Sequence, residues 1–267
     1  MILPIIVLFI IGAAFGSFLS VLIYRLHKEK KGIFFGKSEC PYCHKNLQWY
    51  DLIPIVSYLM RLGKCGYCKK RISISYLLLE LVCGLMFISF FLIYPFLLFE
   101  IQGIVFFDVG ILLKYIYFCL VGIALIGILF FDAKYLEIPE AFTLPTIILI
   151  FLVGLFLPEP GLYSILIGGA LAGLFFGAQV WISKEKWLGS GDIQVGILMG
   201  LLLGWQLLIL AVLISYVLGS FISLFLMAFK QVTPKSQIPF APFLVTGTFI
   251  TLFFGEYILD LYLNTIF

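Results

Sequence analysis

Residues 115–134 read YIYFCLVGIALIGILFFDAK, an apolar run that ends at Asp132. A helix needs about 20 mostly apolar residues to cross a bilayer, and runs of this kind fill most of the chain. Of its 267 residues, 63% are hydrophobic and 12% are charged, and the mean hydropathy is +1.17. Soluble domains carry about 25% charged residues. The composition therefore excludes a soluble, disordered or collagen-like chain and predicts an all-α polytopic membrane protein.

About eight apolar runs are candidates to span the bilayer. They cover residues 1–24, 76–99, 103–131, 138–157, 162–183, 192–204, 205–229 and 240–262. The run at 192–204 is short, so it is either a half-helix or continuous with the next run around Gly204. One large polar segment, residues 25–75, separates the first two runs.

The basic residues orient these predicted spans. Arg25 and Lys28 follow the first apolar run instead of preceding it, which is the order expected of a retained first helix with its N-terminus outside. In that orientation 16 of the 17 Lys and Arg lie on the inner side, with Lys114 as the exception, and short cytoplasmic loops retain such residues. We therefore expect three parts: a first transmembrane helix at 1–24, a cytoplasmic segment at 25–75 and a transmembrane core at 76–267.

Two C-x-x-C pairs stand in the polar segment, Cys40-Pro-Tyr-Cys43 and Cys65-Gly-Tyr-Cys68. Four thiolates complete a tetrahedral zinc site with no position open for water, which makes the site structural. Metal binding would also stabilise a segment that has few large apolar side chains of its own. The sequence therefore predicts a small zinc-ribbon-like insertion on the cytoplasmic side.

Other arrangements of the cysteines stay open. Two disulfides are the main alternative, although disulfides are rare in the reducing cytoplasm. His44 directly follows Cys43 and could replace one thiolate as a ligand. Cys83 and Cys119 lie within apolar runs, where a cysteine usually packs as a small hydrophobic side chain.

Two aspartates stand at ends of predicted spans on the inner side. Asp132 ends one run, and Asp192 opens another after Gly189-Ser190-Gly191. Ionisable groups in such places are costly and usually functional. Peptide hydrolysis by two carboxyl groups needs one ionised and one protonated, a state that two carboxyls in a partly desolvated site adopt by sharing a proton. The pair is therefore a candidate protease site, and Gly189 and Gly191 would let an extended substrate approach the backbone closely.

The same residues admit two other interpretations. Asp192 suits a helix N-terminus as a cap, whereas Asp132 stands at a C-terminal end, where the helix dipole disfavours an anion. A proton-coupled transporter or assembly factor would also place acidic residues in a membrane. Glu137, Glu140 and Glu185 stand near the same face as further candidate partners. Residue spacing alone does not choose among protease, cap and proton relay.

Motifs along the whole chain resemble the prepilin peptidase (type IV leader peptidase) family. Phe131-Asp132 with Ile138-Pro139, and Gly189-Ser190-Gly191-Asp192, are similar to its two signature motifs, the second being G-x-G-D. The other similar stretches are Phe15-Gly16-Ser17-Phe18-Leu19 with Tyr24-Arg25, the segment from Cys40 through Leu47-Gln48-Trp49-Tyr50-Asp51 to Tyr76 and Glu80, and Ile238-Pro239-Phe240-Ala241-Pro242-Phe243-Leu244. These motifs follow one another in the family's order, which makes the resemblance specific.

The resemblance implies a membrane aspartic endopeptidase with Asp132 and Asp192 as its catalytic pair. Such an enzyme would lie in the bacterial cytoplasmic (inner) membrane with its active site facing the cytoplasm. It would cleave the short basic leader of prepilins or pseudopilins after a glycine. Many members with the four cysteines also methylate the new N-terminus with S-adenosylmethionine. The expected partners are these substrates and the lipid bilayer but no nucleic acid, in keeping with a net charge of only +3.

Several positions depart from the family pattern. Gln194 stands where a Lys is usual, Glu140 where an Asn is common, and Ala241 where a Gly is common. Ser20 replaces an Asn, and Ser75-Tyr76-Leu77 replaces Arg-Tyr-Pro. None removes a catalytic carboxylate. Proteolysis is therefore expected to be retained, whereas the changes around Ser75 and the lack of a glycine-rich nucleotide motif bear on methylation.

A basic leader raises a question of charge. Segment 25–75 has eleven basic and three acidic residues, a net charge of +8, and would repel such a leader. We expect this segment to lie against anionic lipid headgroups, which attract juxtamembrane basic residues by about 1 kcal/mol each. Glu137, Glu140 and Glu185 are then the candidates that receive the leader.

Overall fold

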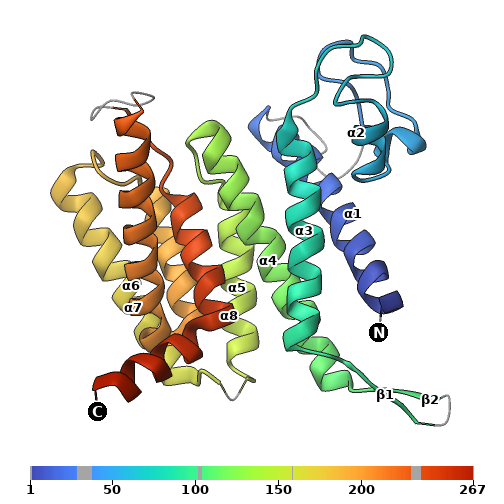
Figure 1. The fold of residues 1–267 in the computed structure, drawn as a ribbon. Coiled ribbons are helices and arrows are strands. Elements are labelled where there is room, and N and C mark those ends of the chain that lie inside the picture. Colours follow the sequence, from blue (N-terminus) through green and yellow to red (C-terminus); the bar gives the residue numbers. More distant parts are fainter. Residues whose placement is uncertain (1, 29–37, 102–103, 158, 230–235, 267) are drawn as a thin grey trace. The chain divides into compact units, whose positions relative to one another are not determined.

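A computed structural model describes residues 2–28, 38–101, 104–157, 159–229 and 236–266. Within these ranges the regular structure is helical apart from one short hairpin (Figure 1), and the polar segment consists largely of turns with two isolated β-bridges. Six of the described helices are long and apolar enough to cross a membrane. These are α1 (Ile2–His27), α3 (Ile74–Ile93), α4 (Val109–Tyr135), α6 (Leu162–Ser183), α7 (Ser190–Ala228) and α8 (Ala241–Ile266). The predicted helical, multi-pass architecture is confirmed at this level, and α5 (Glu140–Gly154) is a shorter apolar helix.

The prediction of helix on both sides of residue 100 is wrong. The sequence predicts spans at 76–99 and 103–131, whereas α3 ends earlier and α4 begins later than these ranges. Between the two helices, β1 (Leu97–Ile101) and β2 (Ile104–Phe107) pair as an antiparallel hairpin.

Local signals explain this hairpin. Pro95 stops α3, because the residue before a proline is disfavoured in the helical region. Asp108 starts α4 by accepting a hydrogen bond of 3.0 Å from the Ile111 N–H at its Oδ1 atom. The aromatic and β-branched residues between these two signals favour strand over helix.

The chain divides into two compact units, residues 1–130 and 131–267, with the boundary inside α4. In the first unit, α1 and α3 cross closely at glycines: a Cβ at Gly16 would lie 2.6 Å from the Leu79 carbonyl oxygen, and Gly12 meets the next turn of α3 in the same way. Glycines four positions apart permit such an approach. The three-part division of the sequence at residues 24 and 75 remains a prediction.

The polar segment follows α1 and contains a single turn of 3-10 helix, η1 (Trp49–Leu52), and α2 (Val56–Met60). It lies at the end of the α1–α3 pair that is opposite to the N-terminus (Figure 1). Buried Glu80 of α3 accepts a hydrogen bond of 2.7 Å from the Ile55 N–H. Ile55 has φ = 62°, which is unfavourable for a β-branched residue. The hydrogen bond from its N–H to Glu80 helps to hold Ile55, and with it the segment, on α3. Lys30, Lys31 and Lys37, counted among its basic residues, lie outside the described residues.

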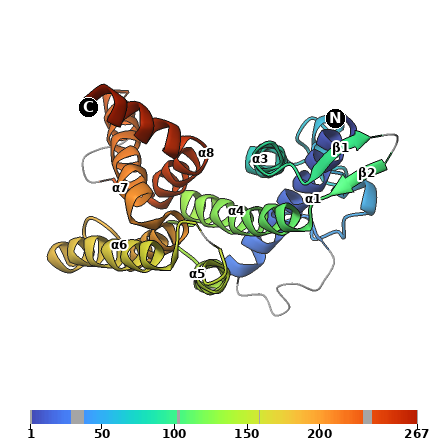
Figure 2. The ribbon, with the colours of Figure 1, turned by 90° about the horizontal axis from the view of Figure 1, so that it is seen from below.

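In the second unit, α7 lies between α6 and α8 (Figure 2). Its single non-helical residue is Gly204, with φ = 73° and ψ = 172°. A Cβ on Gly204 would be 3.1 Å from Pro160, which precedes α6. The residues before Gly204 run antiparallel to α6. The residues after it run antiparallel to α8, since Gly219 meets Phe243 and Gly255 meets Leu207.

The chain therefore reverses at Gly204, and the two ends of α7 lie at the same end of the unit (Figure 1). A positive φ is accessible to glycine at little cost, which lets one residue replace a loop. The predicted runs at 192–204 and 205–229 are thus the two arms of α7. Lys230 and Lys235, which follow the second arm, lie outside the described residues.

Candidate active site

Asp132 lies in the last turn of α4 and is only 6% exposed. Its Oδ2 atom accepts a hydrogen bond of 3.1 Å from the backbone N–H of Ala241, the first residue of α8. The first N–H groups of a helix have no partner within that helix and carry partial positive charge. The start of α8 therefore compensates for the unfavourable position of a carboxylate at the end of α4.

Asp192 lies in the first turn of α7 and is equally buried. Its Oδ2 atom accepts a hydrogen bond of 3.0 Å from the backbone N–H of Gly189, the residue just before α7. The carboxylate therefore does stabilise the start of its own helix, as the capping interpretation predicts. Each of the two carboxylates thus accepts a hydrogen bond from a backbone N–H at a helix start.

The structure brings the two aspartates together from positions 60 residues apart in the sequence. Their carboxyl groups are close enough to interact electrostatically. Two carboxyls that share a partly desolvated site cannot easily both ionise. An ionised and a protonated carboxyl side by side can act together as base and acid.

The two motifs that carry the aspartates are in direct contact. A Cβ at Gly191 would lie 2.8 Å from the Cβ of Ile138, which is closer than side chains can approach. Glycine is therefore required at 191 to let the start of α7 rest on the segment between α4 and α5. Gly189 has no such steric role, since its nearest neighbour would be Asp192 at 3.9 Å. What Gly189 supplies is its N–H group.

The acidic residues predicted as further partners do not join the buried pair. Glu137, Glu140 and Glu185 are all exposed, and Glu140 is the first residue of α5. Their exposure leaves them available to a charged ligand in water rather than to the chemistry of the aspartates.

Two polar residues near the pair were missed by the sequence reasoning. Thr143 is fully buried and its hydroxyl donates a hydrogen bond of 2.6 Å to Oε1 of Gln194, the residue that replaces the family's usual Lys. Tyr216 lies within electrostatic range of Asp192 and donates a hydrogen bond of 2.7 Å to Oε1 of Gln179. Only the reversal of α7 brings Tyr216, twelve positions after Gly204, level with Asp192, twelve positions before it.

The four paired cysteines form a second cluster, in the first unit. Their sulfur atoms all lie within 4.8 Å of one another; the four residues are Cys40, Cys43, Cys65 and Cys68. Zinc–sulfur bonds of about 2.3 Å place the ligands of a tetrahedral site about 3.8 Å apart, and the Cys40–Cys68 sulfur distance is 3.9 Å. The donor set and its spacing therefore fit a zinc ion. All four thiols are free, so the disulfide alternative is not the arrangement of this structure.

The two C-x-x-C turns have the same backbone geometry. The Cys40 N–H donates to the Lys45 carbonyl at 3.0 Å and the Cys65 N–H donates to the Lys70 carbonyl at 2.9 Å. His44 and Lys69 follow the second cysteine of each pair, and both have positive φ, 54° and 60°. His44 is exposed and absent from the cluster. Its position matches that of a lysine in the other turn, which argues against a role as metal ligand.

The thiols differ in how readily they ionise. Burial raises the pKa of Cys65, but hydrogen bonds from the backbone of Cys68 and Tyr67 and from neighbouring thiols outweigh it and lower the pKa to about 7. A hydrogen bond from the Lys45 backbone lowers the pKa of Cys43, yet desolvation and the nearby thiols raise it to about 11. Zinc requires thiolates, so metal binding at neutral pH must displace protons from this cluster.

A pocket of about 250 Å³ in the first unit is lined in part by the buried Arg25. The guanidinium could pair with a carboxylate such as that of a methyl donor. Among the described lining residues, the rest are Ser17, Ser38 and apolar side chains, with no acidic residue for a ribose. These described residues alone therefore do not make a complete S-adenosylmethionine site.

The chain is similar to known proteins over most of its length. Residues 10–94 match the model of the bacterial peptidase A24 N-terminal domain, and residues 119–224 match that of the type IV leader peptidase family. A prepilin leader peptidase/N-methyltransferase of Vibrio cholerae is 30% identical, over 92% of this chain and 94% of its own. The chain belongs to the type IV leader peptidase family. Relatives of the same name in Bacillus subtilis and Stutzerimonas stutzeri are 29% and 27% identical, covering 97% and 96% of this chain and 97% and 92% of their own lengths.

No solved structure matches the chain. The resemblance to the type IV leader peptidase family predicted from the motifs is confirmed, and the chain is an enzyme of this family. The matched ranges contain both aspartates and all four paired cysteines. Residues 238–244, where Ala241 contacts Asp132, lie beyond the second matched range.

Proposed function

We propose that this enzyme cleaves the basic leader of prepilins or pseudopilins after a glycine, with Asp132 and Asp192 as its catalytic pair. The observation that carries the proposal is the meeting of two buried carboxyl groups from the ends of α4 and α7. Relatives named prepilin leader peptidase/N-methyltransferase, matched over nearly their whole length, support the substrate class. The runner-up, a proton relay, would need no contact with a peptide.

The chemistry follows from the shared proton. The ionised aspartate takes a proton from a water molecule, whose oxygen attacks the carbonyl carbon of the scissile bond. The protonated aspartate donates its proton to the carbonyl oxygen, and the tetrahedral product then collapses as the leaving nitrogen is protonated. The N–H groups of Ala241 and Gly189 hold the two carboxyls in place. Either carboxyl can start as the base in this scheme.

The proposed orientation puts the N-terminus outside and the active site on the cytoplasmic side of the inner membrane. Eight crossings result if both arms of α7 and the short α5 span the bilayer. The strong bias of Lys and Arg to one side supports this. Exposed Glu137, Glu140 and Glu185 then face the cytoplasm, where they receive the basic leader.

The cysteine cluster holds a structural zinc ion in this proposal. Four thiolates leave no open coordination position, so the ion would fold the polar segment and take no part in hydrolysis. The same enzyme methylates the new N-terminus with S-adenosylmethionine, as the name of its relatives suggests.

The test is cleavage of a prepilin peptide by the purified full chain in liposomes. Wild type should release the leader, and Asp132→Asn and Asp192→Asn should each reduce cleavage by at least about 10³-fold, the loss typical of a catalytic group acting within a unit. A methylated product should be about 14 Da heavier, the mass of one CH₂. Cleavage that survives either substitution at near wild-type rate would exclude the two-aspartate mechanism.

A further inference from the structure

Tyr216 lies on the second arm of α7 and is held in place by α6. Its hydroxyl donates a hydrogen bond of 2.7 Å to Oε1 of Gln179 on α6. The Nε2 atom of Gln179 donates in turn to the Phe175 carbonyl at 3.5 Å, which orients the amide. The ring of Phe175 also packs edge-on against that of Tyr216, with centroids 6.1 Å apart. Both the hydroxyl and the ring of Tyr216 are therefore fixed from α6.

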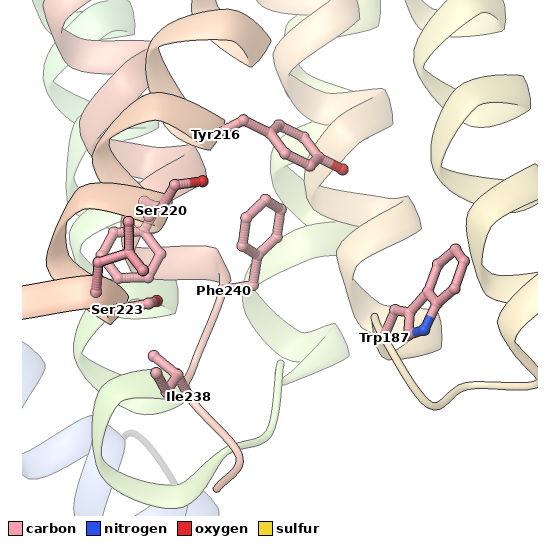
Figure 3. Close-up of a pocket in the computed structure, with 9 residues that line it drawn as sticks. Trp187, Tyr216, Ser220, Ser223, Ile238 and Phe240 are labelled. Carbon is pink, nitrogen blue, oxygen red and sulfur yellow. The ribbon is translucent and has the colours of Figure 1, made fainter. Parts of the chain in front are cut away.

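The ring of Tyr216 also contacts Phe240, the residue just before α8. The two centroids are 5.1 Å apart and the rings meet edge-on, a geometry that aromatic pairs favour. Figure 3 shows both rings in the lining of one pocket, with the tyrosine hydroxyl pointing away from its own backbone. In the described part of the chain, Tyr216 is the only aromatic residue outside α8 whose ring contacts Phe240. It therefore connects α6 to the start of α8.

Phe240 in turn fixes the backbone group that holds Asp132. The Phe240 carbonyl accepts hydrogen bonds from the N–H groups of Phe243 and Leu244, at 3.0 and 3.3 Å, and so begins α8. The same peptide bond carries the Ala241 N–H, which donates to Asp132 at 3.1 Å. Because a peptide group is planar and rigid, a shift of Phe240 changes the direction of this N–H. The position of Phe240 therefore decides how Asp132 is held.

We propose that Tyr216 is a positioning residue for the catalytic pair. The hydrogen bond to Gln179 fixes the orientation of its ring, and the ring in turn fixes Phe240. A displacement of catalytic groups by about 1 Å can cost about 10²-fold in rate, so a contact one layer away from the aspartates acts on kcat. The proposal rests on the assignment of Asp132 and Asp192 as the catalytic pair.

A direct action of the hydroxyl on Asp192 is the alternative role, because the two groups lie within electrostatic range. In the structure, however, the hydroxyl proton is donated to Gln179. Positioning acts through the ring of Phe240, whereas a direct role does not depend on that ring. The two roles therefore predict different results when Phe240 is changed.

The experiment measures kcat and KM for cleavage of a prepilin peptide by the full chain in liposomes. Tyr216→Phe and Gln179→Met each remove the hydrogen bond, and each should lower kcat by about tenfold while KM stays within about twofold. The double variant should be no slower than either single variant, because all three lose the same interaction. Rates are referred to folded protein recovered after gel filtration, so an unfolded fraction is not counted as slow enzyme.

A second arm repeats the tyrosine change in a Phe240→Leu chain. There Tyr216→Phe should cost less than about twofold in kcat, since the ring through which it acts is gone. A full tenfold loss in this chain would show direct action of the hydroxyl and overturn the proposal. Losses that multiply in the double variant with Gln179→Met, or a raised KM with unchanged kcat, would overturn it as well.

Tyr163→Phe is the matched control. It removes the same hydroxyl from a residue of α6 that is 84% exposed, so kcat should stay at its wild-type value. A loss equal to that of Tyr216→Phe would show a general effect of tyrosine removal and overturn the proposal. Cleavage that persists at near wild-type rate in Asp132→Asn would instead refute the catalytic assignment, whatever the tyrosine variants do.

Discussion

The two aspartates are positioned by residues that do not take part in hydrolysis. Asp132 depends on the first N–H of α8, and Asp192 on the N–H of Gly189 and on the close contact between Gly191 and Ile138. The sequence indicates the aspartates because an acidic residue at the end of an apolar run is conspicuous. It does not indicate Ala241, whose contribution is a backbone group and depends on the path of α8.

Gly191→Ala should impair catalysis through a steric clash. The new methyl group would meet Ile138 at 2.8 Å, and overpacking of this kind costs about 1–3 kcal/mol. We expect kcat for leader cleavage to fall by at least about tenfold, equivalent to about 1.4 kcal/mol, and Ile138→Ala in the same chain to restore part of it. Gly177→Ala is the control, because its Cβ would meet nothing within 4 Å. Equal activity of the two alanine variants would contradict the steric account.

Charge reversal at the exposed acidic residues should weaken the binding of basic leaders. We expect Glu137→Lys combined with Glu140→Lys to raise KM by about tenfold. The kcat should change little, because these side chains are exposed and lie outside the buried pair. The effect should shrink at high salt, which screens exposed charges. Glu256→Lys reverses the charge of an exposed residue on α8 and should leave KM unaltered. An unchanged KM in the double variant would remove the proposed role in leader binding.

At the scale of the elements, hydropathy predicts where the helices lie, whereas single proline and aspartate residues indicate where helices end and begin. Apolar runs located most of the helices, because a bilayer demands about 20 such residues in succession. Apolar runs failed to predict the structure around residue 100. There a hairpin of mostly apolar residues lies between Pro95 and Asp108. The apolar runs left open whether the chain reverses around Gly204 or continues there as one helix. The approach of Tyr216 to Asp192 was therefore beyond prediction.

The cysteine segment should depend on metal for its fold. Cys40→Ser and Cys65→Ser should each lose the single bound zinc, seen by elemental analysis, and should lower thermal stability and methylation more than proteolysis. Loss of zinc should be faster at pH 6 than at pH 8, because protons compete with the metal for the thiolates. His44→Asn should keep the metal, as its matching position in the other turn is a lysine. A metal-free wild-type protein would contradict the site.

At the scale of the whole molecule, the distribution of charge predicts which side of the membrane each loop occupies. The structure adds that the two ends of α7 lie at the same end of its unit. That segments 184–191 and 230–239 share one side of the membrane stays a prediction. Orientation in the bilayer also stays a prediction, made from the basic residues.

The orientation can be tested by labelling introduced cysteines in spheroplasts with a membrane-impermeant maleimide. Tyr163→Cys, at the exposed start of α6, should react in intact spheroplasts. Lys186→Cys, in the exposed turn before α7, should react only after the membrane is opened. Wild type, whose cysteines are either buried or in the polar segment, sets the background. The reverse pattern would invert the proposed topology.

The reversal at Gly204 also bears on how the enzyme enters the membrane during synthesis. Because one residue joins the two arms of α7, no polar loop has to be carried across the bilayer between Asp192 and Tyr216. In the proposed orientation residues 190–228 would leave the translocon as a single helical hairpin, and an external protease would find no loop to cut there. Asp192 and Tyr216, one on each arm, would thereby be inserted together.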